Sequence, residues 1–459
     1  MSALRMHEVV ERALALSEAD DCVVIGSEHT SANVRWANNT STTNGLSTGN
    51  RVHVVSIIGG RVGSVGVTNP TAENLESTVR RSEAACEGRP EAEDAMPLLP
   101  GDGVPADWAE PVEALGIIAF TSLAPALGEA FRRAEAGGIR LFGYAEHDTS
   151  TTWLATSTGM RRRYTHLDGR IEVNAKTPDF ARSTWAGQTS TSFDDVDVPA
   201  IYDNLVERLG WASTSIELPA GRYEVLLEPS AVADMLYYLY SSSSAREADE
   251  GRTVFSRPGG GNRIGEQLYA PSVSLYSDPA ELPIEVTPFV VTSSSSSFAS
   301  VFDNGLPLGR TQWARDGVLE ALVSTRHWAA RTGTEPRPFV GNLVFDSPTG
   351  PDLAGMIAST TGPALLVTCF WYIREVDEQT LLLTGLTRDG VYLVEDGEVK
   401  GAVNNFRFNM SPVDMLAQVL EMGATVPTLP REFGDWFRNT KVPPLRVGRF
   451  NMSSVSKAT

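Results

Sequence analysis

Cysteine is scarce in this chain of 459 residues. It occurs only three times, at Cys22, Cys86 and Cys369, and no two of these form a C-x-x-C pair. An odd number of widely separated cysteines excludes a disulfide framework, and the absence of paired thiolates excludes a zinc knuckle. We therefore expect a protein of a reducing compartment whose stability comes from an ordinary hydrophobic core.

Positive charge and long apolar runs are also in short supply. The 38 Lys and Arg residues are outnumbered by 57 Asp and Glu residues, which gives a formal net charge of −19. This acidity disfavours binding to nucleic acid and to anionic membranes, because both carry negatively charged phosphates. The best apolar run, Ala364–Ile373, is too short to cross a membrane, and the first 20 residues lack the apolar core of a signal peptide. We expect a cytoplasmic protein that binds neither nucleic acid nor membrane.

Apolar residues are nevertheless plentiful enough for two to three domains. Their share is 42%, against 21% charged residues, which is typical of a soluble globular protein. Near the N-terminus, an apolar stripe that begins at Met6 predicts a helix, and Gly59-Gly60 predicts a turn between strands 51–58 and 61–67. Asn69-Pro70 is expected to open a second helix, and a third is expected over about residues 120–136.

The first 200 residues contain an internal repeat. The pair Glu28-His29 recurs as Glu146-His147 after 118 residues, and Trp36 recurs as Trp153 after 117. Each occurrence follows a predicted helix and precedes a predicted hairpin. We therefore predict an N-terminal α+β domain, residues 1–215, built from two related helix and strand repeats at about 1–90 and 118–190. Chance similarity between two Thr-rich strands is the alternative.

The second half of the chain is predicted to be mostly β. Apolar and β-branched runs separated by turn signals predict strands at 223–227, 272–276, 284–292, 298–302, 317–324, 365–373, 381–383 and 391–394. Helices are expected at 230–240, 352–360 and 412–422. We predict an overall α+β fold whose C-terminal domain, residues 216–459, is a β-rich barrel or sandwich with a few helices.

Several residue groups are candidates for chemistry, and each has a simpler structural interpretation. The histidines of Glu28-His29 and Glu146-His147, with His166, offer metal-binding side chains, but their place in the repeat indicates strand-end residues of structural origin. The serine runs 241–244 and 293–297 lack the nucleophile elbow of a serine hydrolase. Cys369 lies in an apolar run, which indicates a buried side chain and not a nucleophile. The glycine-rich stretch 257–261 lacks the Lys-Ser/Thr of a phosphate-binding loop.

A family resemblance runs along nearly the whole chain. Residues 222–279, which contain RYEVLLEPSAVADMLYYL, TVFS and IGEQLYAPSVSLYSDP, resemble the central region of the TldD/PmbA family. The resemblance continues through VFDNGLPLGRTQWARDGVLEALVSTRHWAARTG (301–333), ALLVTCFW (364–371) and TGLTRDGVYLVEDGEVKGAVNNFRFNMSPVDMLAQVLEMGA (384–424). It also includes NNTSTTNGLSTGNRVHVVSIIGGRVGSVGVTNPTAENL (38–75) in the N-terminal half.

The resemblance implies one of two kinds of subunit. TldD-like members are zinc metalloproteases with an HExxxH motif on the central helix and a cysteine ligand near the C-terminus, whereas TldE-like members lack both and pair with a TldD-like partner. Counted back from TVFS, the motif window starts at Leu236 and ends at Ser241, with Tyr237 where the motif has Glu. None of these side chains is a good zinc ligand or can activate a metal-bound water. The chain therefore resembles the TldE-like kind, with no catalytic and no metal-binding residue of its own.

This resemblance implies one function, which stands beside two alternatives. The chain is predicted to be a non-catalytic subunit that completes a protease for extended peptides, with zinc held by a TldD-like, HExxxH-bearing partner in a hetero-oligomer. Tyr237, Tyr238 and Tyr240 are expected either to face a peptide or partner or to fill the core contacts of their helix. The alternatives are a self-sufficient hydrolase with an altered site and a peptide-binding homodimer of the isolated chain. Relatives carry the label "modulator of DNA gyrase", but the acidity argues against direct contact with DNA.

Overall fold

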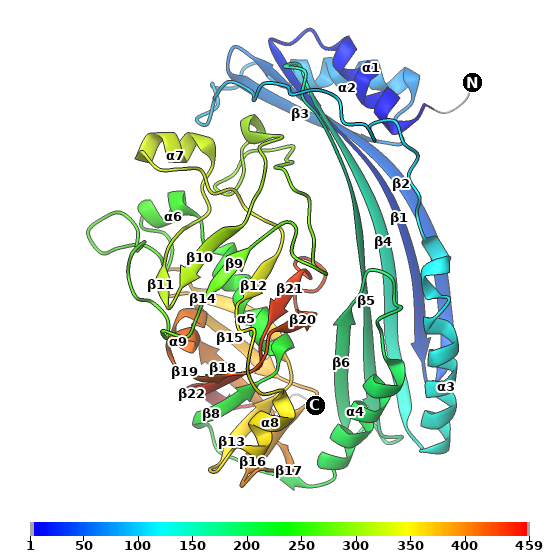
Figure 1. Ribbon diagram of the computed structural model, residues 1–459, viewed down its shortest axis with the longest axis vertical. Coiled ribbons are helices and arrows are strands. Elements are labelled where there is room, and N and C mark those ends of the chain that lie inside the picture. Colours follow the sequence, from blue (N-terminus) through cyan, green and yellow to red (C-terminus); the bar gives the residue numbers. More distant parts are fainter. Residues whose placement is uncertain (1–3, 457–459) are drawn as a thin grey trace.

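A curved antiparallel sheet forms the N-terminal half of the protein. The structure, a computed structural model, describes residues 4–456. The strands of this N-terminal sheet follow the order β3-β2-β1-β4-β5-β6. Their bounds are β1 Asp21–Ala37, β2 Thr40–Ile58, β3 Arg61–Thr68, β4 Arg140–Thr156, β5 Arg161–Lys176 and β6 Ser183–Thr189. Figure 1 shows helices along the convex side of the sheet and the C-terminal half on its concave side.

Two units with the same element order build this sheet. The helices are α1 Met6–Leu16, α2 Ala72–Ala84, the 3₁₀ turn η1 Gly116–Phe120, α3 Leu123–Ala136 and α4 Val198–Trp211. The first unit therefore runs α1-β1-β2-β3-α2, and the second runs α3-β4-β5-β6-α4. They meet where β1 pairs antiparallel with β4, with Thr30 opposite Thr149. The predicted pair of related repeats is thus confirmed.

The tryptophans of the repeat cross between the two units. Trp36 of the first unit is buried in the cluster that contains Leu123 and Leu127 of α3. Trp153 of the second unit is buried in the cluster that contains Met6 and Val10 of α1. Each unit therefore covers an aromatic side chain supplied by the other.

The C-terminal half contains two further sheets. One has the order β11-β10-β9-β12-β21-β20, and the larger has the order β14-β15-β18-β22-β8-β13-β16-β17-β7, with β19 pairing to β22. The smaller sheet consists of β9 Leu275–Ser277, β10 Thr311–Arg315, β11 Val318–Leu319, β12 Leu343–Phe345, β20 Val426–Thr428 and β21 Thr440–Val442. The larger consists of β7 Ser215–Ile216, β8 Gly221–Leu227, β13 Ala364–Val367, β14 Phe370–Asp377, β15 Leu382–Thr387, β16 Val391–Glu395, β17 Glu398–Val403, β18 Phe406–Met410, β19 Val419–Met422 and β22 Leu445–Val455.

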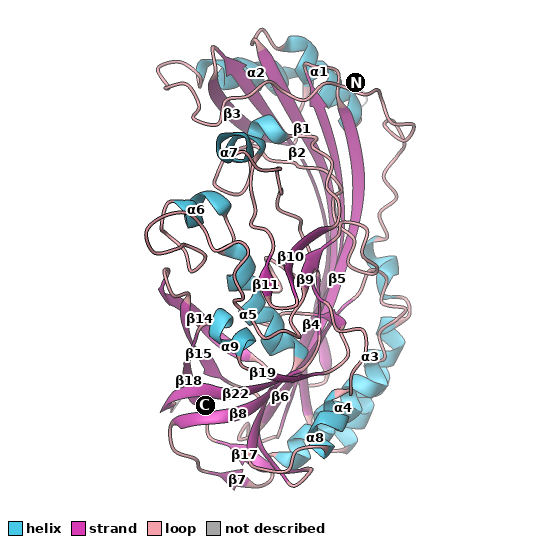
Figure 2. Ribbon diagram, turned by 60° about the vertical axis from the view of Figure 1, so that its left-hand side comes forward, coloured by secondary structure: helices cyan, strands magenta, loops and turns pink. Residues whose placement is uncertain are grey.

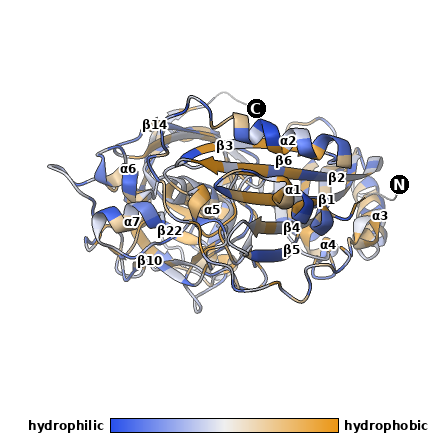
Figure 3. Ribbon diagram, turned by 90° about the horizontal axis from the view of Figure 1, so that it is seen from above, coloured by the Kyte–Doolittle hydropathy of each residue, from blue (hydrophilic) through white to orange (hydrophobic). Residues whose placement is uncertain are grey.

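One helix is buried between these two sheets. The helices are α5 Pro229–Ser241, α6 Ala245–Asp249, α7 Arg326–Thr332, α8 Leu353–Ala358 and α9 Pro412–Ala417, with a 3₁₀ turn η2 at Val301–Asp303. Helix α5 lies between strands of the two sheets (Figure 2). It shares one hydrophobic core with residues of both sheets. Apolar segments gather on α5 and the central strands, whereas α2, α6 and α7 carry more polar residues (Figure 3). The predicted α+β class is confirmed. Over the described residues the sheets do not close on themselves, so the C-terminal half is not a barrel.

Several predicted elements differ from the structure. Residues 284–292 and 298–302 form no strand ladder, and the second of these runs into the 3₁₀ turn η2, which begins at Val301. The run 317–324 is a strand only at Val318–Leu319, and the helix expected over 412–422 ends at Ala417 before β19 begins. A β-branched run forms a strand only where a second segment supplies partners, which the local sequence does not specify.

The start of α2 also differs from the prediction. Thr71, and not Asn69, caps the helix by accepting a hydrogen bond from the Asn74 backbone, while the Asn74 side chain accepts one from the Thr71 backbone. Asn69 instead has a left-handed backbone, with φ of 52°. The two-residue shift places Pro70 outside the helix.

Among residues 4–456, no helix is both long and apolar enough to cross a membrane. The domain boundary at 215 stays a prediction.

Candidate functional site

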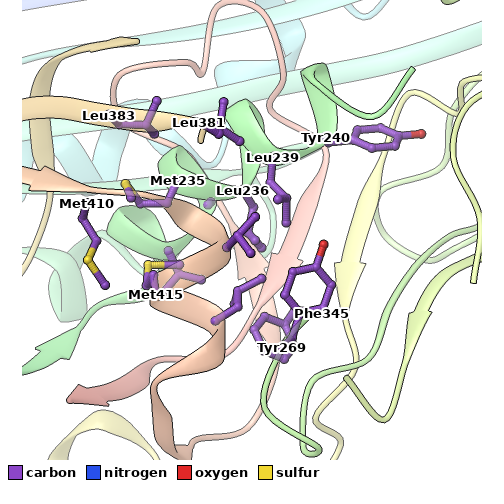
Figure 4. Close-up of a cluster of buried hydrophobic side chains, with 14 of the residues drawn as sticks. Met235, Leu236, Leu239, Tyr240, Tyr269, Phe345, Leu381, Leu383, Met410 and Met415 are labelled. Atoms are coloured by element: carbon purple, nitrogen blue, oxygen red, sulfur yellow. The ribbon is translucent and has the colours of Figure 1, made fainter. Parts of the chain in front are cut away.

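Helix α5 carries the window in which the metal motif was sought. It starts at Pro229. Proline lacks a backbone N–H, but the N–H groups of the first helical turn have no acceptor within the helix, so no hydrogen bond is lost. The predicted apolar stripe is present, since Val232, Met235, Leu236 and Leu239 are all buried in the largest core cluster. Figure 4 shows Met235, Leu236 and Leu239 directed into this cluster, beside Met415. The helix is therefore held by packing on its apolar face.

The three window residues do not fit a zinc ion. Leu236 is fully buried among apolar side chains, and Ser241 donates its hydroxyl to the Tyr238 carbonyl at 3.1 Å. The Tyr237 ring stacks on Phe433 with centroids 4.2 Å apart. An aliphatic side chain, an already bonded hydroxyl and a stacked phenol offer none of the imidazole or thiolate ligands that zinc takes in proteins. Within the described part of the chain, no group of three or more His, Cys, Asp or Glu side chains could hold a metal ion.

Aromatic rings occupy the surroundings of this window. We call Tyr237, Tyr238, Tyr240, Phe339, Phe433 and Phe437 the aromatic cluster. Tyr238 meets Phe433 edge to face at 5.1 Å, and Tyr240 stacks on Phe339 at 4.8 Å and approaches Phe437 at 5.7 Å. Aromatic pairs in such geometries add stability beyond their buried area. Only the tyrosines were predicted from the sequence, because the phenylalanines lie 100 to 200 residues further along the chain.

The three tyrosines have different environments. Tyr240 is 5% exposed, and its hydroxyl both donates to the Val340 carbonyl and accepts from the Val340 N–H. It therefore makes core contacts. Tyr238 is half-buried and donates to the Ile373 carbonyl at 3.0 Å, while Tyr237 is half-buried against Phe433. Burial raises the pKa of all three phenols above the ordinary value, so they stay protonated at neutral pH.

A buried carboxyl on the same helix holds the loop that carries Phe433 and Phe437. Asp234 is fully buried, and one of its oxygens accepts from the backbone N–H groups of Glu432 and Phe433, at 3.0 and 3.3 Å. Its second oxygen has no hydrogen-bond partner. Burial raises the pKa of this carboxyl well above its ordinary value, against the opposing effect of the two N–H groups. No sequence pattern indicates the role of Asp234 beyond its place in the helix.

The loop between β20 and β21, residues 429–439, connects this site to the N-terminal sheet. Arg438 lies 3.2 Å from Glu146 and 3.3 Å from Asp168, with Asp148 at 3.7 Å. Arg170 of β5 forms ion pairs with Glu146 and with Asp435 of the loop. All of these side chains except Asp435 are largely buried. We call them the loop's ion-pair network, and it fixes the loop against the concave face of the sheet.

The predicted Glu-His pairs do not converge on one site. His29 lies on the concave face, with Nδ1 2.8 Å from the Ser150 hydroxyl and Nε2 3.5 Å from Asp148. His147 is buried and directed to the opposite face, where Nε2 donates to the Thr191 carbonyl at 2.8 Å. His166 lies opposite Ser150, 3.8 Å from Asp168. Because neighbouring residues of a strand face opposite ways, His29 and His147 lie on different faces of the sheet. The two Glu-His pairs are therefore not at equivalent positions of the two units, and they do not form one metal site.

The remaining nucleophile candidates have structural roles. Ser244 caps α6, Ser243 bonds the Tyr240 carbonyl, and Ser296 accepts from two backbone N–H groups of its own loop. Cys369 is fully buried, and burial raises the pKa of its thiol although Arg431 donates to the sulfur at 2.9 Å. The sequence did not reveal that arginine. The glycine-rich stretch is an exposed hairpin, with positive φ at three consecutive glycines, Gly259 to Gly261.

A cavity of about 380 Å³ lies next to the aromatic cluster. Its sheet wall is polar and includes Ser150 and His166 of the concave face. Its other walls include Phe298 and Phe339, and Phe339 is also the ring on which Tyr240 stacks. The volume falls within the range of ordinary ligand pockets. The cavity therefore lies between the N-terminal sheet and the C-terminal half, separated from α5 by one layer of rings.

Comparisons with known proteins agree on one family. The model for the PmbA/TldA metallopeptidase C-terminal domain matches residues 220–454, slightly more than half of the chain. No curated protein sequence matches the chain.

Solved structures match over nearly the full length. TldE from Thermococcus kodakarensis aligns with a TM-score of 0.79 and 14% identity over 97% of this chain and 99% of its own. A proposed modulator of DNA gyrase from Thermotoga maritima aligns with a TM-score of 0.76 and 16% identity over 97% and 100% of the two chains. A third, from Bacteroides thetaiotaomicron and also named for DNA gyrase modulation, gives 0.73 and 14% over 97% and 98%. At sequence identities of 14 to 16%, this structural similarity establishes the fold of the chain and nothing further.

Proposed function

Because this chain belongs to the TldD/PmbA family, we propose that it is a TldE-like, non-catalytic subunit of a two-component zinc metalloprotease that processes unfolded peptides. In this proposal the zinc belongs to a TldD-like partner that carries the HExxxH motif. The two chains form a hetero-oligomer, and neither is an active protease alone.

One observation carries the proposal. At the family's metal window this chain has Leu236, Tyr237 and Ser241, and all three side chains are engaged in packing or hydrogen bonding within the chain. A catalytic zinc site needs three protein ligands and an open position for water. The window has neither, which supports the proposal that the catalytic zinc is bound by a second chain.

A protease assay with matched mixtures tests this proposal. The purified chain is incubated with an unfolded peptide alone, with its HExxxH-bearing homologue from the same organism, and with that homologue after Glu→Gln replacement in the motif. We expect cleavage only in the mixture with the intact homologue. Cleavage by this chain alone, or one zinc ion per chain by elemental analysis, would contradict the proposal.

Co-purification tests the partner directly. Affinity capture of this chain from its native organism should bring down the HExxxH-bearing homologue in a fixed ratio. The net charge of −19 argues that DNA is not the ligand of the complex. Recovery of a homodimer without the homologue would support a peptide-binding homodimer instead.

A further inference from the structure

A polar band crosses the convex face of the N-terminal sheet between its two groups of helices. On one side of the band, Val24 and Val52 pack in the cluster that contains Met6 of α1. On the other side, Ala32 packs in the cluster that contains Leu123 of α3. Two rows of polar side chains on β1, β2 and β4 lie between these clusters, namely Glu28 with Asn50 and Thr151, and Thr30 with Thr48 and Thr149. On this face the two units therefore meet over polar side chains.

A cavity of about 280 Å³ lies over this band, and we call it the convex cavity. The strands supply most of its lining, and Val112 and Ala114 of the connection between α2 and α3 supply an apolar part. Glu28 and Thr30 flank His29, which points to the concave face, so their own side chains point to the convex face. The convex cavity is therefore separated by the sheet from the cavity beside the aromatic cluster.

Glu28 places a half-buried carboxyl group in the convex cavity. Among residues 4–456 it has no ion-pair partner, since Arg163, whose charge acts on it, pairs with Asp107 at 2.9 Å. Burial raises the pKa of Glu28, and the opposing effects of Arg163 and of the Met6 backbone N–H offset this only in part. A half-buried negative charge without a partner is unfavourable, and a bound cation would stabilise it.

Two buried oxygen atoms beside Glu28 are the second feature of this cavity. In the part of the chain that the structure describes, the side-chain carbonyl of Asn50 and the hydroxyl of Thr149 have no hydrogen-bond partner. Asn50 lies directly opposite Glu28, and Thr149 lies directly opposite Thr30. Thr149 is only 1% exposed, and rotation about its Cα–Cβ bond can present its hydroxyl to the cavity that it lines. Buried polar atoms are rarely left unpaired, so these two indicate a ligand that donates hydrogen bonds.

We propose that the convex cavity binds the primary ammonium group of a small aliphatic amine, with Glu28 as its counter-ion and Asn50 and Thr149 as hydrogen-bond acceptors. An ammonium group has one positive charge and three N–H donors, which matches one carboxylate and two neutral acceptors. The side chains of Val112 and Ala114 provide an apolar wall for the alkyl chain.

The lining also limits which amines fit. The volume of about 280 Å³ is near the lower end of ligand pockets, which suits a short molecule and not a bare metal ion. None of the described Lys and Arg residues lines the cavity, so an amine that also carries a carboxylate has no counter-ion for it. The expected ligand is therefore a short amine or diamine without an acidic group.

Three ligands of equal length test this chemistry. Diaminobutane, butanediol and aminobutanoate, each with its two functional groups at the ends of a four-carbon chain, are titrated calorimetrically against the isolated full chain at neutral pH. We expect the diamine to bind to one site per chain. The diol and the amino acid should bind at least about tenfold more weakly, because the first lacks the charge and the second adds an unpaired carboxylate. No binding of the diamine, or equal binding of the diol, would overturn the proposal.

A matched pair of substitutions tests the location. Glu28→Gln keeps the shape of the side chain and removes its charge, whereas Glu76→Gln removes a charge from an exposed position of α2. The control is needed because a chain with a net charge of −19 attracts cations over its whole surface. We expect Glu28→Gln to weaken diamine binding at least about tenfold and Glu76→Gln to leave it unchanged. Equal effects of the two substitutions would place the amine elsewhere and overturn the proposal.

Thr149→Val distinguishes a ligand contact from a structural role. Its hydroxyl has no partner within the described chain, so its removal should not lower the free energy of unfolding. The same substitution should weaken diamine binding by about fivefold, the usual effect of one lost hydrogen bond. Unchanged binding would contradict the proposed set of acceptors. The convex cavity and α5 lie on opposite sides of the sheet, so these results bear on this site alone and not on the proposed protease subunit.

Discussion

The rings of Tyr237 and Phe433 lie nearly parallel, with centroids 4.2 Å apart and an angle of 12° between their planes. One ring comes from α5 and the other from the loop 429–439, so the stack joins the window helix to the loop that reaches the N-terminal sheet. A metal motif with glutamate at position 237 would lack this contact. The window is therefore a packed part of the structure.

This stack should be measurable as a coupling energy. In a double-mutant cycle, Tyr237→Leu and Phe433→Leu are each expected to lower the free energy of unfolding. Their combined effect should fall short of the sum by about 0.5 to 1.5 kcal/mol, the usual value of an aromatic pair. Urea unfolding followed by circular dichroism gives the four free energies. Additive effects would mean that the two rings do not interact in solution.

Restoring the metal motif is expected to damage the fold before it creates a site. Leu236→His removes a fully buried leucine and buries an imidazole without a partner, which should lower the free energy of unfolding by about 2 to 5 kcal/mol. Ser241→His, at an exposed position, should change it by less than about 0.5 kcal/mol. The triple variant with Tyr237→Glu should bind no stoichiometric zinc, as measured by elemental analysis. Tight zinc binding with unchanged stability would show that the window is a latent metal site.

Arg438 should be important for stability because three carboxylates surround it. Arg438→Gln leaves Glu146, Asp148 and Asp168 together without their shared cation, on side chains that are each less than one-fifth exposed. We expect the free energy of unfolding to fall by about 2 to 4 kcal/mol, as for other largely buried pairs that lose one member. Arg315→Gln breaks an exposed pair with Glu320 of similar length and should cost less than about 1 kcal/mol. Similar losses of unfolding free energy in the two variants would mean that the loop's ion-pair network stabilises the fold no more than an exposed ion pair does.

Asp234 should make stability depend on pH in a defined direction. Its pKa is raised in the folded protein, so the folded state holds the proton more tightly than the unfolded chain does. Stability should therefore fall as pH rises from about 4, the unfolded pKa, to the folded pKa, by up to about 1.4 kcal/mol per pH unit. Asp234→Asn keeps an acceptor for Glu432 and Phe433 and cannot ionise. The stability of this variant relative to the native chain should rise with pH over that interval and then level off, which unfolding experiments at several pH values can follow. A difference that stays constant with pH would mean that Asp234 does not titrate in this range.

Local patterns predicted some parts of the protein well. The i, i+3, i+4, i+7 stripe of α5 is present because packing against two sheets buries one face of the helix. The repeat of Trp36 and Trp153 predicted two related units, since each aromatic residue marks a core position of its strand. The run 284–292 predicted a full strand, but only one of its edges has a partner.

Other parts had no local signal. Arg438 meets Glu146 across almost 300 residues of sequence, and Arg431 meets Cys369 through a loop that no periodicity describes. Such contacts follow from the tertiary arrangement, in which the 429–439 loop lies between two halves of the chain. The phenylalanines of the aromatic cluster were missed for the same reason.

The exchange of Trp36 and Trp153 between the repeats bears on how the N-terminal half folds. A chain cut between the repeats would expose one large indole on each fragment, at the strand face that the missing helices cover. Neither fragment would then have a complete interior, and each would present the free edge of its 17-residue central strand to aggregation. The duplicated halves therefore form a single cooperative folding unit, and the later repeat must be synthesised before the earlier one can be completed.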